Sequence, residues 1–428
     1  MPAPAPEPIR PRRVVITGMG VATGLGLEWP DLWHGLLNGA CGIRPVSFAD
    51  DHPELPVRIA GQVDDDRLAT GLQRYALNEP DRGNQLGLYV VGRALEDAGL
   101  PVDGRSPLPF DLIVGSGHGN VSFSNEATRT FIERGFRRLR PTTVVRVMFS
   151  RAASVVSIRY KLIGASFTVS AACATGAVAL GEAFQRIRFG LVDGAVAACC
   201  DSGLDLYTFA AWNRLGVLSR IPEPELASRP FDRRRDGLVI GEGAAAFVLE
   251  SAEAAAQRGA RIWAEIAGYG CASDATHIVR PDLDGQVRAM HAALHSAGMA
   301  ADDIDAVNAH GTATELADVV EAASLVKVLG ARAAAVPVTT TKAQLGHLMG
   351  ATAGVELVTS ILGLHHGLLP PCRNLDDPDP RCTLDFVREV PRAAAFRVVL
   401  KNSFAFGGTN SAVILRKAPE TDRRLAAT

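Results

Sequence analysis

The sequence predicts an α/β fold in which helices cover parallel β-sheets. Strand-like runs rich in β-branched residues alternate with helix-like runs along the whole chain, and this alternation is typical of parallel sheets. The 428 residues are 47% hydrophobic and include 42 glycines, which suits one large domain or two coupled halves with a sizeable core. No run approaches about 18 uninterrupted apolar residues, so the sequence indicates no membrane span.

The first half of the chain carries its predicted elements in the order strand, helix, strand, strand, helix. Apolar runs that stop at glycine mark the strands, and the spacing of Leu86, Tyr89, Val90 and Leu95 is helical. The elements are a strand at 14–17, a helix at 85–98, a buried strand at 111–114 before a glycine-rich loop, a strand at 167–170 and a helix at 174–189. The loops that follow strands are where an α/β fold usually places its site.

The second half repeats this order, which predicts an internal duplication. It contains a strand at 262–266, a helix at 285–298, strands at 305–308 and 336–341, and a helix at 353–364. The strand at 305–308 then corresponds to the one at 111–114, and the strand at 336–341 to the one at 167–170. We expect the halves to span 13–259 and 260–418, with a disordered tail at 1–12 and a second tail at 419–428.

Charge and cysteine usage argue against several classes of protein. The formal net charge is only −2, which argues against a dedicated nucleic-acid binder. The seven cysteines are odd in number and lack a CxxC pair or regular spacing, so they predict a reducing, cytoplasmic compartment rather than a disulfide framework. Adjacent Cys199 and Cys200 are interpreted as small buried residues.

One cysteine, Cys173, stands where a thiol can become reactive. It lies in the run Thr168-Val-Ser-Ala-Ala-Cys-Ala-Thr-Gly176, between a β-branched stretch and a helix-forming stretch. The first turn of a helix presents unpaired backbone N–H groups and the positive end of the helix dipole, and both favour a thiolate. The dipole alone lowers the pKa of a thiol by roughly one unit, so full ionisation at neutral pH needs other groups.

Two histidines later in the chain complete a pattern typical of acyl-thioester chemistry. His310 lies in Asn308-Ala-His-Gly-Thr-Ala-Thr314, and His347 closes Lys342-Ala-Gln-Leu-Gly-His347. The flanking glycines would let a substrate approach both side chains closely. The sequence therefore predicts Cys173, His310 and His347 as catalytic residues, with Cys173 as the nucleophile.

Four segments are similar to the β-ketoacyl-acyl-carrier-protein synthases, the condensing enzymes of the thiolase superfamily. They are Ser170-Ala-Ala-Cys-Ala-Thr175, Asn308-Ala-His-Gly-Thr312, Thr341-Lys-Ala-Gln-Leu-Gly-His347 with Gly354-Val-Glu356, and Asn402-Ser-Phe-Ala-Phe-Gly-Gly-Thr-Asn410. The resemblance implies a thiolase-like fold of two duplicated halves in an α-β-α-β-α arrangement. It also implies an elongating, carrier-dependent enzyme of fatty-acid or polyketide synthesis, in the latter case a ketosynthase alpha subunit.

The reaction that the resemblance implies is a ping-pong decarboxylative Claisen condensation. Cys173 would take an acyl group from its carrier thioester, and malonyl-acyl carrier protein would then extend it. His310 and His347, as neutral imidazoles, would each donate a hydrogen bond to the enolate that forms on decarboxylation. Neither histidine needs to act as a base.

Further site residues follow from the same resemblance. Lys342 would lie in a charged cluster and position the histidines. The matching acids are Asp318 and Glu321, whose spacing puts both on one helical face, where they could share the ammonium group; a solvated acidic face is the alternative. The backbone N–H groups of Cys173 and Phe406 would form the oxyanion hole, and Phe406 would be the gating aromatic beside the thiol.

The resemblance implies substrates carried on the phosphopantetheine of acyl carrier protein, with no bound metal or nucleotide. Thr312 and Thr314 match hydroxyls that bind the pantetheine arm, although both could be turn residues. Family members are dimers, so we expect a homodimer or a heterodimer with a chain-length-factor-like subunit. An acidic carrier needs a basic docking patch, for which the candidates are Arg134, Arg137, Arg138, Arg140 and Arg214; a solvated loop is the alternative for these residues.

The chain departs from the family pattern at four positions. Ala405 replaces the usual glycine before the gating aromatic, which should stiffen the gate loop. Ala313 and Glu315 replace the common serine and proline beside the pantetheine entrance. His118 stands where long-chain relatives carry an aliphatic residue, and Trp212 matches a pocket-lining aromatic. The last two predict an acyl pocket that is shortened or more polar.

Three other functions are weighed against this one. A thiolase would need a second catalytic cysteine in the glycine-rich loop at 402–410, which has none. A non-catalytic chain-length partner typically lacks a nucleophile like Cys173. A nicotinamide dehydrogenase would need GxGxxG, which Gly18-Met-Gly20-Val-Ala-Thr-Gly24 does not fit, and we interpret those glycines as a tight turn after the first strand.

Overall fold

A computed structural model describes residues 11–75 and 77–418 of the chain. Residues 1–10 and 419–428, most of the two predicted tails, lie outside the described residues. Arg12 was also expected in the tail, and this is wrong. Its backbone N–H donates to the Arg188 carbonyl, and its guanidinium pairs with Asp193 at 2.6 Å, so it is fixed to the body of the protein.

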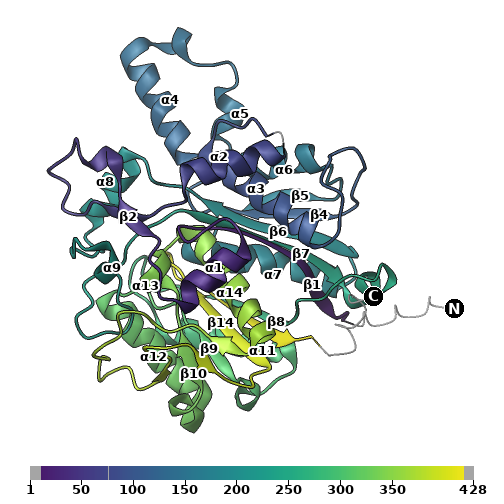
Figure 1. Ribbon diagram of the computed structural model, residues 1–428, viewed down its shortest axis with the longest axis vertical. Coiled ribbons are helices and arrows are strands. Elements are labelled where there is room, and N and C mark those ends of the chain that lie inside the picture. Colours follow the sequence, from purple (N-terminus) through teal and green to yellow (C-terminus); the bar gives the residue numbers. More distant parts are fainter. Residues whose placement is uncertain (1–10, 76, 419–428) are drawn as a thin grey trace.

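Eleven strands of the described chain form one large mixed sheet (Figure 1). In spatial order the strands are β12 (Asp385–Phe386), β10 (Pro337–Thr339), β9 (Ala306–Asn308), β14 (Val398–Phe404), β15 (Thr409–Lys417), β8 (Ala264–Ser273), β1 (Val14–Ala22), β7 (Gly243–Ser251), β6 (Gly194–Asp201), β4 (Asp111–Gly115) and β5 (Ser166–Val169). The two halves of the chain meet where β1 pairs with β8 over three residues, Val14 to Ile16. Smaller two-stranded sheets pair β2 (Ile43–Pro45) with β3 (Ile59–Gly61), and β11 (Leu368–Leu369) with β13 (Arg392–Ala393).

The strand order confirms the predicted internal duplication. Read outward from the β1–β8 contact, the first half gives β1-β7-β6-β4-β5 and the second gives β8-β15-β14-β9-β10. In both halves the three outer strands are parallel, and the two inner strands are antiparallel. Strand β4 therefore corresponds to β9, and β5 to β10, which are the two pairs that the sequence predicted.

Helices divide the molecule into five layers, α-β-α-β-α. Between the two half-sheets lie α7 (Thr175–Arg188) and α14 (Thr352–His366), which contact each other and strands of both halves. The outer layers contain α3 (Arg82–Asp97) and α6 (Arg151–Tyr160) on one side, and α11 (Leu283–Ala297) and α12 (Glu315–Leu329) on the other. The remaining helices are α1 (Trp29–Leu37), α2 (Asp65–Arg74), α4 (Val121–Arg134), α5 (Thr143–Val147), α8 (Leu206–Leu215), α9 (Pro224–Ala227), α10 (Ala252–Gln257) and α13 (Lys342–Leu345).

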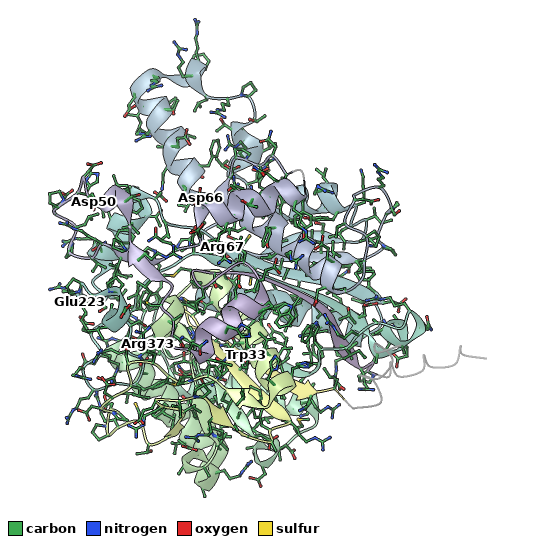
Figure 2. All side chains as sticks on the ribbon, viewed as in Figure 1. Trp33, Asp50, Asp66, Arg67, Glu223 and Arg373 are labelled. Atoms are coloured by element: carbon green, nitrogen blue, oxygen red, sulfur yellow. The ribbon has the colours of Figure 1, made fainter. Side chains whose placement is uncertain are left out.

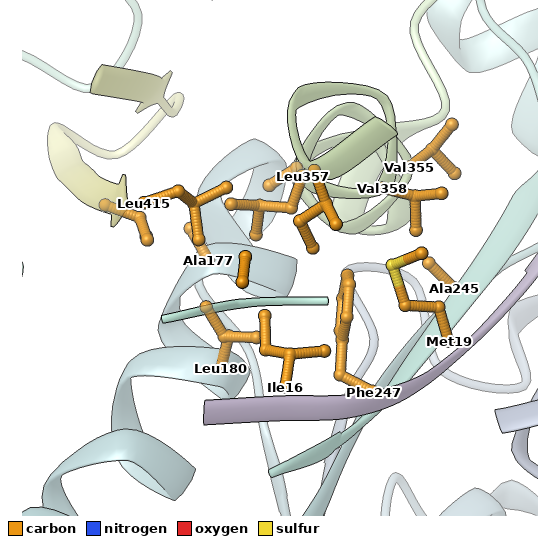
Figure 3. Close-up of a cluster of buried hydrophobic side chains, with 14 of the residues drawn as sticks. Ile16, Met19, Ala177, Leu180, Ala245, Phe247, Val355, Leu357, Val358 and Leu415 are labelled. Carbon is orange, nitrogen blue, oxygen red and sulfur yellow. The ribbon is translucent and has the colours of Figure 1, made fainter. Parts of the chain in front are cut away.

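The largest hydrophobic core surrounds the inner helix layer (Figure 3). Ile16 and Phe247 from the first half-sheet, Leu180 from α7 and Leu357 from α14 are all buried in it. Burial of each such side chain is worth roughly 1.5–3 kcal/mol relative to an exposed one. This layer therefore holds the two halves in register. At its edge, Trp33 of α1 stacks on His366 at a centroid distance of 5.4 Å (Trp33 is labelled in Figure 2).

Only one of the N-terminal glycines, Gly24, lies in the predicted turn after the first strand, at 23–26. Gly18 and Gly20 lie inside β1, and α3 crosses directly over them. A Cβ atom on Gly18 would come within 2.2 Å of the Ala94 carbonyl oxygen, and one on Gly20 within 2.0 Å of the Val90 carbonyl oxygen. These glycines permit close packing of a helix on a strand, which is why the cofactor-loop pattern was imperfect.

One segment stands away from the layers. The arm, as we call residues 120–150, consists of α4, a 3-10 turn at 136–138 and α5, and it projects from the body (Figures 1 and 2). At its base, Ser122 and Asn125 of α4 hydrogen bond to Asp205, the N-cap of α8, at 2.9 Å each. Over the described residues, no helix combines the length and apolar character needed to cross a membrane.

Candidate active site

Cys173 lies on a 3-10 turn (Ala172–Ala174) that joins the end of β5 to the start of α7. Thr175 closes this turn, because its hydroxyl accepts from the Ala171 N–H at 2.8 Å and donates to the Ala172 carbonyl at 2.6 Å. Ala172 has a φ of +44°, a left-handed conformation that costs about 1–3 kcal/mol for a residue with a side chain. The strained turn directs the thiol into a cavity of about 270 Å³.

The pKa of Cys173 is raised rather than lowered, so the expectation that its place at the start of the helix favours the thiolate is wrong. Burial raises the pKa of this thiol to about 11, and it outweighs the backbone N–H of Phe406 and the Lys342 ammonium, which act in the opposite direction. The N–H of Cys173 itself also hydrogen bonds to the sulfur. Two N–H groups therefore converge on the thiol from Cys173 and Phe406, as predicted for the oxyanion hole, while Cys173 rests as a neutral thiol.

His310 and His347 line the same cavity as Cys173, as the sequence predicted. His310 follows the end of β9, and His347 follows α13. Their ring centroids are 5.4 Å apart and the ring planes are nearly perpendicular, at 89°. Both side chains are buried, so they face the cavity rather than bulk water. The structure brings together three residues that are up to 174 positions apart in the chain.

The surroundings keep both imidazoles neutral. Burial first, and the Lys342 ammonium second, hold the pKa of His310 and of His347 well below the usual value. The Met349 N–H donates to Nδ1 of His347 at 3.0 Å, so the ring proton of neutral His347 resides on Nε2 and can be donated. Thr352 Oγ1 also lies 3.0 Å from this Nδ1. For His310, Nδ1 is buried and has no hydrogen-bond partner among the described residues.

The predicted support of Lys342 by Asp318 and Glu321 is wrong. Lys342 Nζ instead pairs with Glu356 Oε1 at 2.7 Å and donates to the carbonyl oxygen of His310. Glu356 is on α14, which packs on the end of β14, whereas the predicted acids are on α12. The 318/321 spacing correctly placed both acids on one helical face, but that face meets backbone N–H groups rather than the ammonium.

Asp318 and Glu321 hold the loop that carries His310. Glu321 accepts from the N–H groups of His310 and Gly311 at 2.7 Å each. Asp318 accepts from the N–H groups of Thr312 and Ala313 at 3.0 and 3.1 Å. Both carboxylates are buried, so the alternative of a solvated acidic face is also wrong. They fix the backbone of His310 and position its ring indirectly.

The gate region contains the predicted aromatics, but only some of them line the cavity. Phe406 and Trp212 line it, together with Ala405. The rings of Phe406 and Trp212 are stacked, with their centroids 6.4 Å apart. His118 is not a lining residue of this cavity, contrary to the prediction for it. It lies behind Trp212, whose indole N–H donates to His118 Nε2 at 3.4 Å, and its other nitrogen is 3.7 Å from Asp201.

The residues predicted at the pantetheine entrance lie at or next to the cavity. Thr312 and Thr314 line it, and their hydroxyl oxygens are 2.9 Å apart. Ala313 has a φ of +64°, so this loop is tightly bent, and Glu315 begins α12 next to it.

The arginines of the predicted docking patch divide into two groups. Four of them are exposed near the tip of the arm (Arg134, Arg137, Arg138 and Arg140), whereas Arg214 is exposed on α8 next to the lining residue Leu215.

Sequence reasoning missed several residues of the site. Glu356 stood in a quoted motif, as the only acid in the apolar helix at 352–366, but it was not assigned to Lys342. Lys401 is a lone charge in the apolar run at 398–404. Asp201 ends the buried strand β6 and accepts from the N–H groups of Gly117 and Gly350, which belong to different halves. Arg280 lines the cavity mouth, and no pattern in the sequence marked it.

The described residues offer no group of three or more His, Cys, Asp or Glu side chains arranged to hold a metal ion. All seven cysteines lie in the described part of the chain, and all are free. Cys199 and Cys200 are buried in β6, which confirms their interpretation as core residues.

Comparison with known families agrees with this geometry. The model of the β-ketoacyl synthase N-terminal domain matches residues 11–255, and that of the C-terminal domain matches residues 263–376. The chain is 36% identical over 411 residues to the 3-oxoacyl-[acyl-carrier-protein] synthase 2 of Coxiella burnetii, with 95% of this chain and 99% of that protein covered. It is 38% identical over 419 residues to the protein of the same name from Rhizobium meliloti, with the same coverage.

Solved structures confirm the thiolase-like fold. The ishigamide ketosynthase/chain length factor has a TM-score of 0.88 and 33% identity, with 96% of this chain and 100% of that chain covered. A ketosynthase in complex with its type II polyketide synthase acyl-carrier protein, bound to the hexaketide, has a TM-score of 0.88 and 28% identity, with 95% and 100% covered. The chain therefore belongs to the β-ketoacyl synthase family, the condensing enzymes of fatty-acid and polyketide synthesis.

Proposed function

We propose that Cys173 receives an acyl group from an acyl carrier protein and that His310 and His347 promote its condensation with malonyl-acyl carrier protein. The observation that carries this assignment is the convergence of the three side chains on one cavity, with two backbone N–H groups at the thiol. The paired imidazoles are neutral, which suits donors to an enolate better than a general acid and base pair.

In the acylation step, the Cys173 sulfur attacks the thioester carbonyl. The carbonyl oxygen becomes an oxyanion, which the N–H groups of Cys173 and Phe406 are placed to receive. The C–S bond to the pantetheine then breaks, and the carrier leaves as a thiol with the proton that Cys173 has lost. Because the resting thiol has a raised pKa, the proton must depart as the carbonyl is attacked rather than beforehand.

In the condensation step, the C–C bond to the malonyl carboxylate breaks and carbon dioxide leaves. The electron pair forms an enolate, whose oxygen can accept from Nε2–H of His347 and from an N–H of His310. The enolate carbon attacks the acyl-Cys173 carbonyl, and the C–S bond to Cys173 breaks. Cys173 leaves as a thiolate and takes up a proton from water, because its own proton left with the first carrier, and the β-ketoacyl chain remains on the carrier.

The carrier would dock beside Arg214 and Arg280, with the arm arginines as a second contact. Arg280 lines the cavity, and Arg214 is next in the chain to Leu215, which also lines it. An acidic carrier would be attracted to cations at this mouth, and its pantetheine would then reach Thr312 and Thr314. We include in the proposal a homodimer or a heterodimer with a chain-length-factor-like subunit, the absence of a metal or nucleotide cofactor, and a cytoplasmic location.

The preferred acyl chain is proposed to be short or polar. Trp212 occupies the cavity wall, and the His118 imidazole fixes it from behind. Burial disfavours a charged His118, but the Asp201 carboxylate outweighs it and raises the pKa of His118. Replacing the ring in His118→Ile would free Trp212, so we expect longer acyl groups to be accepted. An unchanged chain-length preference in this variant would contradict the proposal.

Intact-protein mass spectrometry tests the assignment. The wild type and Cys173→Ala would be incubated with acyl-carrier thioesters of graded length, followed by malonyl-carrier protein. We expect an acyl adduct on the wild type alone, and its discharge to a carrier-bound β-ketoacyl product. An adduct that persists in Cys173→Ala would contradict the role of Cys173. An adduct that malonyl-carrier protein cannot discharge would contradict the condensing role.

A further inference from the structure

Lys401 is a buried cation that the mechanism above does not use. It lies in the middle of β14, paired across the sheet with Asn308 of β9 and Val413 of β15, and it is fully buried. Its ammonium group donates to the carbonyl oxygen of Asn402 and to Ser403 Oγ at 3.2 Å. A lysine without an anionic partner would be strongly disfavoured at such a position, because desolvation penalises its charge.

The anion that compensates Lys401 is the one that also holds Lys342. Lys401 Nζ forms an ion pair with Glu356 Oε2 at 2.9 Å, and Lys342 Nζ contacts the other oxygen, Oε1, at 2.7 Å. Glu356 is itself fully buried on α14. One carboxylate thus bridges two ammonium groups from β14 and α13. Because Lys342 also donates to the His310 carbonyl, this bridge extends directly to the backbone of a cavity histidine.

A second carboxylate balances the charge. Glu321 of α12 accepts from the N–H groups of His310 and Gly311, and its Oε1 lies 3.5 Å from Asn402 Nδ2, next in the chain to Lys401. The titratable groups packed around Lys401 are then Glu356, Glu321, Lys342, His310 and His347. Two ammonium groups face two carboxylates, so the cluster is neutral when both imidazoles are neutral.

We propose that Lys401 is a positioning residue of the active site, a second cation that maintains this charge balance and thereby keeps His310 and His347 as neutral hydrogen-bond donors. Its catalytic consequence rests on the proposed function, since only a decarboxylating enzyme would need the two donors. The effect of Lys401 on the protonation of the two histidines depends only on the charged cluster and not on the proposed function.

The sign of the effect follows from the charges. Lys401 contributes to the lowered pKa of both histidines, after burial and Lys342. Without its ammonium, two buried carboxylates would face one cation. The deficit favours uptake of a proton by His310, His347 or a carboxylate between them. Either imidazole would then be protonated more readily than in the wild type, and its titration would move up toward neutral pH.

The test compares Lys401→Met with a matched control, Lys327→Met. Lys327 forms an ion pair of 2.7 Å with Asp284, but its side chain is 53% exposed, so its loss should leave the histidines unaffected. The first readout is nuclear magnetic resonance titration of histidine ring carbons, assigned with His310→Asn and His347→Asn. The second is the rate of malonyl-carrier decarboxylation against pH.

We expect the titration of at least one cavity histidine to move up by about one pH unit in Lys401→Met, and the ratio of the decarboxylation rate at pH 8 to that at pH 6 to rise up to about tenfold. The double variant Lys401→Met/Glu356→Gln leaves one ammonium and one carboxylate, so both shifts should reverse. If Lys401→Met does not fold, Lys401→Gln replaces it. Unshifted histidine titrations, or a shift that the double variant does not reverse, would overturn the proposal.

The two readouts separate this inference from the proposed function. The ring titration requires no turnover, so it reports on Lys401 even if malonyl-carrier protein is not the substrate. A wild type that titrates as expected but does not decarboxylate malonyl-carrier protein would contradict the proposed function alone.

Discussion

At the scale of single residues, Cys173 illustrates how burial competes with hydrogen bonding. Its turn was correctly located from the sequence, because a small-residue run between a strand and a helix is a local pattern. The raised pKa of Cys173 was not predicted, because desolvation depends on atoms from distant segments that close over the thiol. Two N–H groups and a distant ammonium lower the pKa but do not compensate for burial.

The raised pKa of Cys173 predicts how its reactivity depends on pH. With a pKa of about 11, the thiolate fraction grows about tenfold for each pH unit between 7 and 10. We expect the rate of Cys173 alkylation by iodoacetamide, followed on its tryptic peptide, to rise throughout that range. The exposed Cys271 in the same digest controls for reagent quality. A plateau already near pH 7 would show that the thiol is ionised at rest.

The two histidines should affect one half-reaction and spare the other. In the proposed mechanism their neutral rings donate to the enolate, whereas the oxyanion of acyl transfer would accept from the N–H groups of Cys173 and Phe406. His347→Ala should therefore slow malonyl-carrier decarboxylation roughly 10²–10³-fold, the usual cost of one such donor. Acylation of Cys173, measured by intact mass, should fall much less. Equal losses in both steps would indicate instead that His347 activates the thiol.

The charged cluster shows the limit of local patterns at this scale. The spacing of Asp318 and Glu321 predicted a shared face of α12, and the structure confirms that face. What the face meets is decided by packing of α12 against the loop after β9, where unpaired N–H groups need acceptors. Glu356 satisfies Lys342 because α14 crosses between the half-sheets, which no spacing within one segment can reveal.

At the scale of elements, the turn between β14 and β15 carries Phe406, the proposed gating aromatic. Gly407 and Gly408 have φ angles of +86° and +77°, so the tip of the turn needs glycine, whereas Ala405 has an ordinary backbone conformation. Across this turn, the Ala405 N–H donates to the Thr409 carbonyl, and the Gly408 N–H donates to the Ala405 carbonyl. The loop is thus defined by a few hydrogen bonds and by the stacking of Phe406 on Trp212.

Replacing Ala405 by glycine should loosen the gate. Glycine adds backbone freedom to the unfolded chain, so Ala405→Gly should lower the free energy of unfolding by about 0.4–1 kcal/mol. If opening of the gate limits acylation, the acylation rate should increase at the same time. Ala395→Gly, the same change at an exposed loop residue, should alter stability without changing acylation. Faster acylation in both variants, or in neither, would mean that Ala405 does not stiffen the gate.

At the scale of the whole molecule, the duplication explains how the site is assembled. Corresponding strands β5 and β10 lead to Cys173 and to the segment of Lys342 and His347, and corresponding strands β4 and β9 lead to the loops of His118 and His310. The sequence predicted these two pairs because each is a short local pattern. The join through β1 and β8 could not be predicted from such patterns, and the inner helix layer followed only from the family resemblance, since both arise only when the halves pack.

The surface of the whole molecule indicates where the proposed second subunit would bind. Strand β5 ends the main sheet and pairs only with β4 among the described strands, so one of its edges is open to another chain. Exposed apolar side chains gather on the arm and next to β5, among them Val144 at 64% and Ile163 at 63%. Apolar surface of this extent is typical of an interface.

We therefore expect the proposed dimer to form through β5 and the arm. Burying each apolar side chain would contribute roughly 1.5–3 kcal/mol, whereas burying an unpaired carboxylate costs several kcal/mol. Val144→Asp/Ile163→Asp should thus convert a dimer into a monomer in sedimentation velocity, while Leu226→Asp, an equally drastic change at a 47%-exposed leucine of α9, should leave it dimeric. A double variant that still sediments at twice the mass of one chain would place the interface elsewhere. A wild type that dimerises only when a chain-length-factor-like subunit is added would instead assign this surface to a heterodimer.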